Sequence, residues 1–597
     1  MTYARITFAT ALITMTACPP PAASTTDTDP GSTDPTTDTS GASTTPTSGE
    51  TPTSGDTTTD GSTPTEGTTT TEGTTTEGTT TTAGTETDGD TETTGTPSVV
   101  GPARVYYLSG DDPGGSPQFL RLVEVVDGVA SAPETVVDMG PFADEVGTSV
   151  TDGQQTLALR ADAKIWFIDT ATAETSELEL PPAIGAINTF GFSPDGSRLM
   201  ISGGTESKRD MYVCEVGPAS CTPGLMNPPL AGAGTIESYS PFAMSSGNTW
   251  LVYSVDGNND GLDIMVGRVD TPGVASKVLS FLSPAMSMRV AAFTADEQFL
   301  YVGLADSDYH RLDFFAVDLS QQPLVAESLD LPMEYETNGL LAPDLHAILM
   351  WNGEASHGDL YLMPLEGTSL GEPVWLNEAG PGRARKLGFR WADDGSRVAF
   401  LTDHEVYGTD ALYVVDGAGA EAPVKRSGPL PANSFIEEIE FAPDASRLTY
   451  VAWVEGEQTE LFMAELTAPG VATKVSLPLP PSGGGIGTSR WASDSTRLLY
   501  AGVQEAANTE GLFVVQVVDG APTPAAKVSP PLAPGDQVLP WFEFSSDGQR
   551  AFFQPTPDYG TGPLFMAALP DGGPEKAVEI SDPGEAVAYM HVFPPAP

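Results

Sequence analysis

Four oxygen-bearing side chains in one loop have the spacing of a calcium-binding site. Asp256, Asn258 and Asp260 occupy alternate positions, and Asp263 follows shortly after them. Carboxylate and amide oxygens at alternate positions are the ligands that calcium takes from such loops. However, Asp263 comes one residue early, and no Glu stands at the twelfth position. An Asp-Gly hairpin turn without a metal is therefore an open alternative.

A second group of polar residues lies in loops that vary in sequence between regular apolar segments. The acidic members that we expect to form a binding face are Asp403, Glu405, Asp410, Glu455, Glu457 and Glu460. Variable loops on a rigid scaffold are where binding functions usually lie. The sequence thus predicts an acidic loop face that binds a protein or a polymer.

Other chemistries find little support in the sequence. The five histidines are scattered without ligand spacing, which argues against transition-metal chemistry and favours surface or loop positions. There is no Gly-x-Ser-x-Gly motif, and the Gly-rich stretch 482–487 lacks the Lys-Ser/Thr of a phosphate-binding loop. We predict no catalytic residue and no cofactor other than calcium.

A repeated segment positions these loops. Its best copy is Phe190–Gly204, in which apolar runs flank a Ser-Pro-Asp-Gly turn, and copies return about every fifty residues. A repeat of this length indicates a repeat architecture. We align the turns at Asp152, Asp195, Gly247, Asp296, Asp344, Asp394, Asp444, Asp494 and Asp547. An aromatic residue precedes the turn residue by three positions in most copies, and we expect it to face the core.

Each copy has room for about four strands, the size of one blade in a radial repeat. The alternative, a parallel β-helix, has much shorter repeats. The Phe-Ser-Pro-Asp-Gly-Ser-Arg-Leu pattern resembles the WD40-like repeats of the TolB-type β-propeller family over most of residues 103–593. This resemblance implies an all-β propeller of about eight to ten four-stranded blades. It implies little about function, because the family includes periplasmic TolB, peptidase propellers and many surface proteins.

The ends of the array offer a way to close the ring. Segments 103–109 and 119–126 read as strands without a turn marker before them, and 585–593 reads as a single strand. Pairing of the two ends would complete a tenth blade, whereas two sub-rings in tandem are the alternative. The 256–263 loop also resembles the calcium hairpins of integrin-type propellers.

The N-terminal region predicts export. Residues 1–17 have the short apolar core of a signal peptide, and the sequence up to Cys18 resembles a bacterial lipobox. We expect Cys18 to carry lipid; cleavage by an ordinary signal peptidase is the alternative. Residues 18–98 consist almost entirely of Thr, Ser, Gly, Pro and acidic residues, which predicts a disordered linker before a propeller over 99–597. A flexible tether and a glycosylated stalk are both consistent with this composition.

Cysteine usage agrees with an oxidising compartment. Cys214 and Cys221 lie seven residues apart around a predicted turn, so we expect a disulfide, with two free thiols as the alternative. Two cysteines are too few for a structural zinc site.

Charge excludes one class of partner. The chain carries 81 acidic and 26 basic residues, a formal net charge of −55, which repels nucleic acid and anionic lipid surfaces. We expect a non-enzymatic, lipid-anchored scaffold at the outer membrane or cell surface, with its propeller in the periplasm or outside the cell. A polymer-processing enzyme and a calcium-dependent ligand-binding module are the alternatives. An enzyme would need titratable groups from separate blades to converge near the central channel.

Overall fold

Antiparallel β-sheets, repeated around an axis, make up the described part of this computed structural model. It describes residues 103–593 except for short loop gaps, the longest at 111–116, 217–222, 306–311, 330–335 and 378–383. The signal peptide and the linker predicted over residues 1–98, and Cys18, lie outside the described residues. Within the described part there is no helix, and so none that could cross a membrane.

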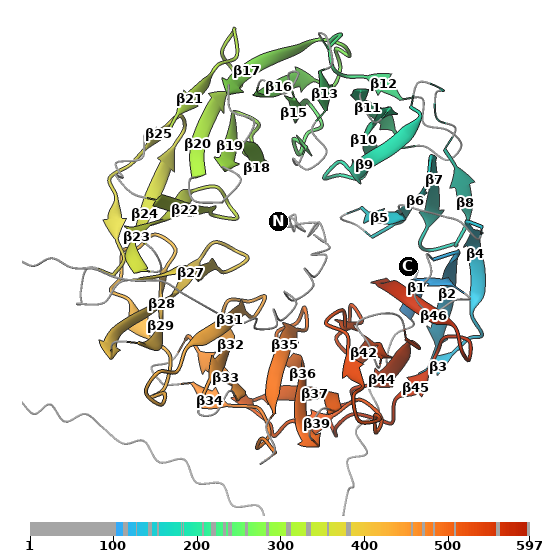
Figure 1. The fold of residues 1–597 in the computed structure, drawn as a ribbon, viewed down its shortest axis with the longest axis vertical. Helices are drawn as coiled ribbons and strands as arrows, with labels where there is room; N and C mark the ends of the chain where they lie inside the picture. The colour runs from blue at the N-terminus through green and yellow to red at the C-terminus, as the bar shows by residue number, and fades with distance from the viewer. Residues whose placement is uncertain are drawn as a thin grey trace, which may run out of the picture. The chain divides into compact units, whose positions relative to one another are not determined.

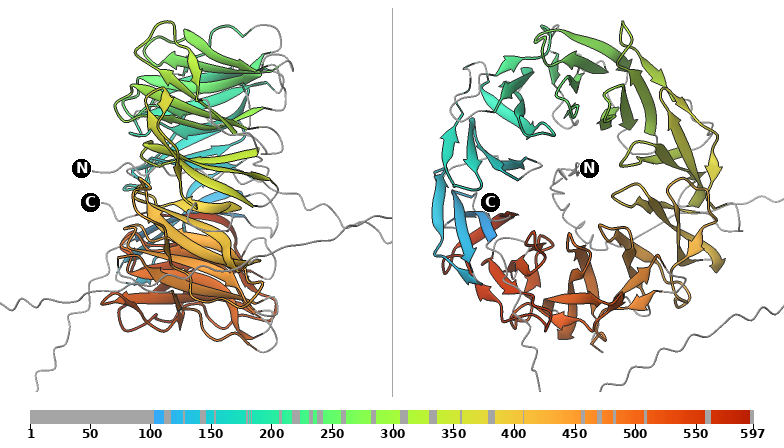
Figure 2. Two further views of the ribbon diagram at one scale, coloured as in Figure 1. Left: turned by 90° about the vertical axis from the view of Figure 1, so that its left-hand side faces the viewer. Right: turned by 180° about the vertical axis from the view of Figure 1, so that it is seen from behind.

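Ten modules, most with four main strands and some with one or two short extra strands, form the ring (Figure 1). We number blades 1 to 9 by the turn copy that each contains, and call the module made by the two chain ends the closing blade. In each numbered blade the first strand lies nearest the axis, and the chain then moves outward. Figure 2 shows the same ring from its edge and from behind. The prediction of an all-β propeller is confirmed.

The strands of blades 1 to 4 are short and regular. Blade 1 contains β5 (Gly147–Val150), β6 (Thr156–Ala161), β7 (Lys164–Asp169) and β8 (Thr175–Glu177). Blade 2 contains β9 (Ala186–Phe192), β10 (Arg198–Thr205), β11 (Lys208–Glu215) and β12 (Gly224–Leu225). Blade 3 contains β13 (Thr235–Ile236), β14 (Ala243–Met244), β15 (Trp250–Asp256), β16 (Leu262–Arg268) and β17 (Ala275–Phe281). Blade 4 contains β18 (Ser287–Phe293), β19 (Phe299–Ala305), β20 (Leu312–Asp318) and β21 (Ala326–Ser328).

Blades 5 to 7 follow the same order. Blade 5 contains β22 (Glu336–Leu341), β23 (Ala347–Glu354), β24 (His357–Glu366), β25 (Ser369–Leu370) and β26 (Val374–Trp375). Blade 6 contains β27 (Ala384–Trp391), β28 (Arg397–Val406), β29 (Thr409–Asp416) and β30 (Val424–Lys425). Blade 7 contains β31 (Ile436–Phe441), β32 (Arg447–Trp453), β33 (Thr459–Glu465) and β34 (Thr473–Lys474). A short β24–β27 pairing joins blades 5 and 6 into one nine-stranded sheet.

Blades 8 and 9 and the closing blade complete the ring. Blade 8 contains β35 (Gly485–Trp491), β36 (Arg497–Ala506), β37 (Thr509–Val518), β38 (Ala521–Pro522) and β39 (Ala526–Lys527). Blade 9 contains β40 (Gln537–Val538), β41 (Glu543–Phe544), β42 (Arg550–Phe553), β43 (Pro555–Thr556), β44 (Phe565–Ala568) and β45 (Val578–Glu579). The closing blade contains β46 (Ala586–Phe593), β1 (Ala103–Gly110), β2 (Phe119–Val126), β3 (Val129–Ala130) and β4 (Glu134–Asp138).

The chain ends close the ring by pairing with each other. The innermost strand of the closing blade is β46, and it pairs antiparallel with β1 from Arg104 opposite Phe593 to Gly110 opposite Ala586. The Glu585 carboxylate, just before β46, accepts hydrogen bonds from Tyr107 Oη at 3.0 Å and from Arg121 Nε at 2.9 Å. The prediction of one ring closed by its two ends is confirmed.

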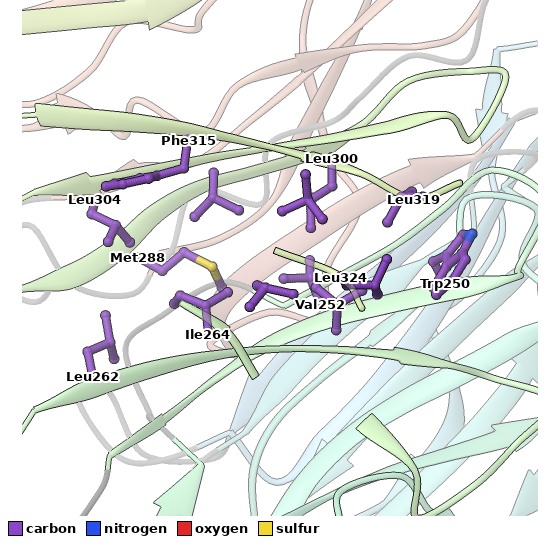
Figure 3. Packing of buried hydrophobic residues seen from close by; sticks show 14 residues of the cluster. Trp250, Val252, Leu262, Ile264, Met288, Leu300, Leu304, Phe315, Leu319 and Leu324 are labelled. Atoms are coloured by element: carbon purple, nitrogen blue, oxygen red, sulfur yellow. The ribbon is translucent and has the colours of Figure 1, made fainter. Parts of the chain in front are cut away.

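The hydrophobic core is divided among the contacts between blades. Each of the ten apolar clusters joins one pair of adjacent blades, including the pairs formed with the closing blade. Figure 3 shows the cluster between blades 3 and 4, where Val252 and Ile264 meet Leu300 and Leu304. The aromatic residue three positions before the turn is buried at Trp391, as predicted. Each blade therefore buries its apolar faces only against its neighbours.

The nine turns share one backbone geometry. In blade 2 the Gly196 N–H donates to Ser193 O at 2.8 Å, and Asp195 Oδ1 accepts from Ser197 N at 2.9 Å. The residue with positive φ in each turn, in chain order, is Gln154, Gly196, Asn248, Glu297, Leu345, Gly395, Ala445, Ser495 or Gly548. Most of these are not glycine, so packing and hydrogen bonds hold the turn even where the side chain disfavours it.

One alignment was wrong by a residue. In blade 1 the Gln154 N–H donates to Thr151 O at 2.7 Å, and Gln154 has the positive φ. The turn of blade 1 therefore lies one residue later in the chain than the alignment at Asp152 predicts. The backbone conformation defines the turn, and the position of an aspartate does not.

Two glycines allow the turn and its packing to be tested separately. We expect Gly548→Ala to lower the free energy of unfolding by about 1 kcal/mol, the approximate cost of a side chain at positive φ, because an added Cβ would approach Ala492 Cβ only to 3.4 Å. Gly196→Ala should cost more, because its Cβ would lie 2.6 Å from Thr151 Cγ2 of the adjacent blade. Urea denaturation of the two variants measures the difference. Equal losses would contradict a role for packing between the turns of blades 1 and 2.

Candidate functional site

One position on the innermost strands changes character halfway around the ring. It lies four residues before the turn residue, and in blades 1 to 5 it is small or apolar: Ser149, Gly191, Ala243, Ala292 and Leu340. In blades 6 to 9 it alternates in charge: Arg390, Glu440, Arg490 and Glu543. The register confirms that these four are equivalent, since they lie opposite Ala399, Thr449, Leu499 and Phe552 on the next strand outward.

Each of these side chains reaches the next blade. Arg390 Nη1 donates to Ile439 O at 3.2 Å. Glu440 accepts a hydrogen bond from Ser489 Oγ at 3.0 Å. Arg490 Nη1 lies 3.8 Å from Glu543 Oε1, an ion pair between blades 8 and 9. Pairing opposite charges on neighbouring strands offsets part of the cost of placing them between blades.

The closing blade adds two further polar aromatic residues on its innermost strand. Tyr589 and His591 lie on β46, with their rings edge to face and their centroids 4.9 Å apart. His591 Nε2 lies 2.9 Å from Thr148 Oγ1 of blade 1. We call the following residues the inner belt: Arg390, Glu438, Glu440, Arg490, Glu543, Tyr589 and His591. They come from five consecutive inner strands, β27, β31, β35, β41 and β46.

Burial shifts the proton affinities of the inner belt. Burial raises the pKa of Glu440 to about 7, although hydrogen bonds from Ser489 and from the Trp491 amide, and the charge of Arg390, act in the opposite direction. Burial also raises the pKa of Glu543, against the charge of Arg490. Burial lowers the pKa of His591 to about 4, so this imidazole is neutral near pH 7. Shifted titratable groups that gather in one place are typical of functional sites.

The inner belt offers two kinds of chemistry. The exposed guanidinium groups of Arg390 and Arg490 can bind carboxylates or phosphates through charge-assisted hydrogen bonds. Glu440 can accept or donate a proton near pH 7, because its pKa lies close to that value. The arrangement can therefore bind a polar ligand, and it places one proton-transfer group beside it.

The predicted calcium loop is described only at its two ends. Asn258 and Asp260 lie outside the described residues, and Asp256 ends β15. The Asp263 carboxylate accepts a hydrogen bond from Ser280 Oγ at 2.5 Å and forms an ion pair with Lys277 Nζ at 3.4 Å. Among the described residues, no three His, Cys, Asp or Glu side chains are placed to hold a metal ion. The calcium site stays a prediction.

The predicted acidic loop face is only partly described. Glu455 and Glu457, and the side chain of Glu405, lie outside the described part. Asp403 accepts a hydrogen bond from Gly408 N at 3.3 Å. Glu460 forms an ion pair with Lys474 at 2.7 Å, which neutralises part of the acidity expected there.

Asp410 has a structural position instead of the surface position that we expected. It is 8% exposed, and its carboxylate accepts hydrogen bonds from Arg385 Nη1 at 2.8 Å and from Ile436 N at 2.9 Å. This side chain therefore connects blades 6 and 7 and is not available to a partner. The sequence did not reveal this, because the contacts come from the preceding inner strand and from the next blade.

Only one of the two cysteines predicted to form a disulfide lies among the described residues. Cys214 is buried on β11 and is disulfide-bonded. Cys221 lies outside the described residues, so its pairing with Cys214 stays a prediction.

Sequence reasoning missed the inner belt, although a signal was present. Reading the position four residues before each turn across the aligned copies shows the alternation Arg390, Glu440, Arg490, Glu543. Binding residues usually lie in loops, whereas these four lie within inner strands. Neither His591 nor Tyr589 belongs to a turn copy, so only ring closure brings them to this site.

Comparisons with known proteins leave the family of this chain open. No known family's sequence model matches the chain, and no curated protein matches it. Similar solved structures include a eukaryotic initiation factor (14% identity, TM-score 0.43, covering 83% of this chain and 99% of the other). They also include the Dos1 propeller (13% identity, TM-score 0.34, covering 60% of this chain and 89% of the other). A third is TolB from Acinetobacter baumannii (14% identity, TM-score 0.24, covering 46% of this chain and 66% of the other). At this level of similarity they say nothing about what this chain binds.

The pKa of Glu440 leads to a prediction about pH. The folded state holds this proton more tightly than the unfolded chain, so the group's contribution to stability is complete below about pH 4.5 and is lost as the pH rises through about 7. On going from pH 5 to pH 8, we expect the free energy of unfolding of Glu440→Gln to rise by about 2 kcal/mol relative to that of the wild type. Urea denaturation at both pH values measures this gain.

The exposed neighbour Glu437 provides the control. We expect Glu437→Gln to follow the wild type at both pH values. His591 acts in the opposite direction at lower pH, but its contribution is common to all three proteins and cancels in the comparison. A Glu440→Gln variant with the wild-type pH dependence would refute the assignment.

Proposed function

We propose that this protein is a non-enzymatic binding scaffold of the cell envelope that holds a protein or polymer segment along its inner belt. The observation that carries the proposal is the alternation of Arg390, Glu440, Arg490 and Glu543 at one repeat position. Packing within a blade does not require charge there, because the same position is small or apolar in blades 1 to 5. Charged side chains on only part of the inner wall are more typical of a binding surface than of a structural repeat.

Charge indicates what kind of segment would fit. With both signs on successive strands, the inner belt complements a segment that itself carries both signs, or many hydroxyl and amide groups. The net charge of −55 opposes polyanions such as nucleic acid. A mixed-charge protein segment or a neutral polymer is therefore the partner that we propose. The acidic loop face would form a second contact with it, through residues such as Asp403 and Glu460.

Attachment to a membrane by lipid on Cys18 belongs to the same proposal. It is supported by the lipobox-like sequence ending at Cys18 and by the linker composition of residues 18–98. Acyl chains would bury methylene groups in one leaflet and hold the propeller near an outer membrane or cell surface. Metabolic labelling with palmitate tests this, since Cys18→Ser should remove the label.

A binding experiment can separate the inner belt from the loop face. The full chain would be cross-linked to isolated envelope material in three forms: wild type, Arg390→Gln with Arg490→Gln, and Asp403→Asn with Glu460→Gln. We expect the arginine pair to weaken capture of the main cross-linked partner about tenfold or more, as loss of charged hydrogen bonds does. Loop variants should weaken it less.

The control is Arg268→Gln, which removes an arginine that pairs with Asp270 on the outer part of blade 3. It leaves the fold and the inner belt intact, so we expect wild-type capture. If the variant with Arg390→Gln and Arg490→Gln captures the partner as well as Arg268→Gln does, the inner belt is not the binding surface.

An enzyme acting on an extracellular polymer is the second candidate, and the pKa of Glu440 favours it. A carboxylate near pKa 7 suits general acid–base catalysis at neutral pH. If this candidate holds, wild-type protein releases new reducing ends or amines from envelope polymers, and Glu440→Gln lowers the rate by about 10²- to 10⁴-fold. Glu437→Gln should keep the full rate. No release by the wild type would refute this candidate and leave the scaffold proposal intact.

A further inference from the structure

A second repeat position has one member that differs from the others. It lies three residues after the turn residue, at the start of the second strand, and five blades have arginine there: Arg198, Arg397, Arg447, Arg497 and Arg550. Four of these form ion pairs: Arg198 with Glu215, Arg447 with Glu465, Arg497 with Asp571 and Arg550 with Asp547. Among the described residues, Arg397 forms no ion pair.

The acidic residue opposite Arg397 is already bound to other groups. Arg397 lies opposite Asp416, just as Arg447 lies opposite Glu465 in blade 7. The Asp416 carboxylate, however, accepts hydrogen bonds from the backbone N–H groups of Ala418 at 3.1 Å and of Glu421 at 2.7 Å. Because Asp416 holds the following turn, the Arg397 guanidinium is left to face other groups.

Those other groups form a pocket between blades 6 and 7. It has a volume of about 340 Å³, and Arg397 and Arg426 both line it. Arg426 is 7% exposed and donates to Glu465 O at 3.2 Å and to Leu466 O at 3.0 Å, which fixes its guanidinium in place. Burial and the charge of Arg397 lower the pKa of Arg426, as expected for like charges held close together.

Two guanidinium groups at one pocket need explaining in a chain with only 26 basic residues against 81 acidic ones. The carboxylates of Asp416 and Glu421 also line the pocket. The first is held by backbone amides, and the second is exposed, where solvent screens its charge. The apolar side chains of Val414 and Leu466 complete the lining and lower the local dielectric, which strengthens an ionic contact.

We propose that the pocket lined by Arg397 and Arg426 binds a small oxyanion, through one carboxylate or phosphate group. Planar guanidinium groups match such oxygens through parallel hydrogen bonds. The volume suits a small organic acid or a phosphate ester. The site lies on the turn side of the blades, at the start of β28 and near the end of β29, and shares no residue with the inner belt.

The strong negative charge of the chain makes the test selective. General repulsion disfavours unspecific anion binding, so saturable binding of an anion requires a local positive site. Isothermal titration of the full chain with inorganic phosphate, and separately with succinate, at constant ionic strength measures it. We expect one saturable site per chain with at least one of the two anions, and the stronger of them identifies the oxyanion.

The repeat supplies a matched control. We expect Arg397→Gln to weaken anion binding about tenfold or more, as loss of a charged hydrogen-bond donor does. Arg447→Gln removes the equivalent arginine of blade 7, which is already paired with Glu465, and should leave anion affinity unchanged. Arg397→Lys should retain part of the affinity.

Three outcomes would overturn the proposal. They are no saturable binding of either anion by the wild type, full affinity in Arg397→Gln, or equal losses in Arg397→Gln and Arg447→Gln. Circular dichroism of each variant checks that the sheets are intact, so that a loss of binding is not a loss of fold. None of these outcomes bears on the inner belt, since the two sites share no residue.

Discussion

The structure depends on one constraint: no blade can bury its apolar faces by itself. The ten apolar clusters each lie between two adjacent blades, so every blade needs a neighbour on both sides. An open array would leave two faces exposed to water. The antiparallel pairing of β1 with β46 removes these ends, and Glu585, bound to Tyr107 and Arg121, holds the same junction with polar contacts.

A closed ring also tolerates locally unfavourable backbone conformations and partly buried charges. Leu345, Ala445 and Ser495 take positive φ in turns where glycine would cost less. Similarly, Glu440 and Glu543 keep carboxyl groups between blades at the expense of raised pKa values. Packing from both neighbours over-determines each position, so the surrounding blades can compensate for a strained turn or a partly desolvated charge.

Polar side chains between blades have two different roles. Asp410 binds Arg385 and the Ile436 amide and so joins adjacent blades, which makes it part of the framework. Arg390 and Arg490 also reach a neighbouring blade, but their side chains remain exposed on the inner strands. The difference in exposure separates a structural connection from a surface that a partner can reach. At the pocket between blades 6 and 7 the difference is one of pairing, since Arg397 and Arg447 are both partly buried and only Arg447 forms an ion pair among the described residues.

The sequence alone determined the strands and eight of the nine turns, because these follow from local chemistry repeated about every fifty residues. It favoured one closed ring over two sub-rings without deciding between them, and the pairing of β1 with β46 decided it. Apolar runs around an Asp-containing turn specify a hairpin wherever they occur, and two unmarked strands at one end complement a single strand at the other. The alternation at Arg390, Glu440, Arg490 and Glu543 was also readable, once the correct repeat position was known. Even the misaligned Asp152 left the strand order intact.

Only the tertiary structure decided which polar residues lie together and which are accessible. Asp410 and Asp403 look alike in the sequence, yet one is buried between blades and the other lies in an exposed hairpin. His591 and Thr148 are separated by 443 positions and meet because the ring closes. Contacts between blades depend on the geometry of the whole ring, whereas a repeat motif records only the geometry of one blade, and this is why the framework was predictable and the candidate sites were not.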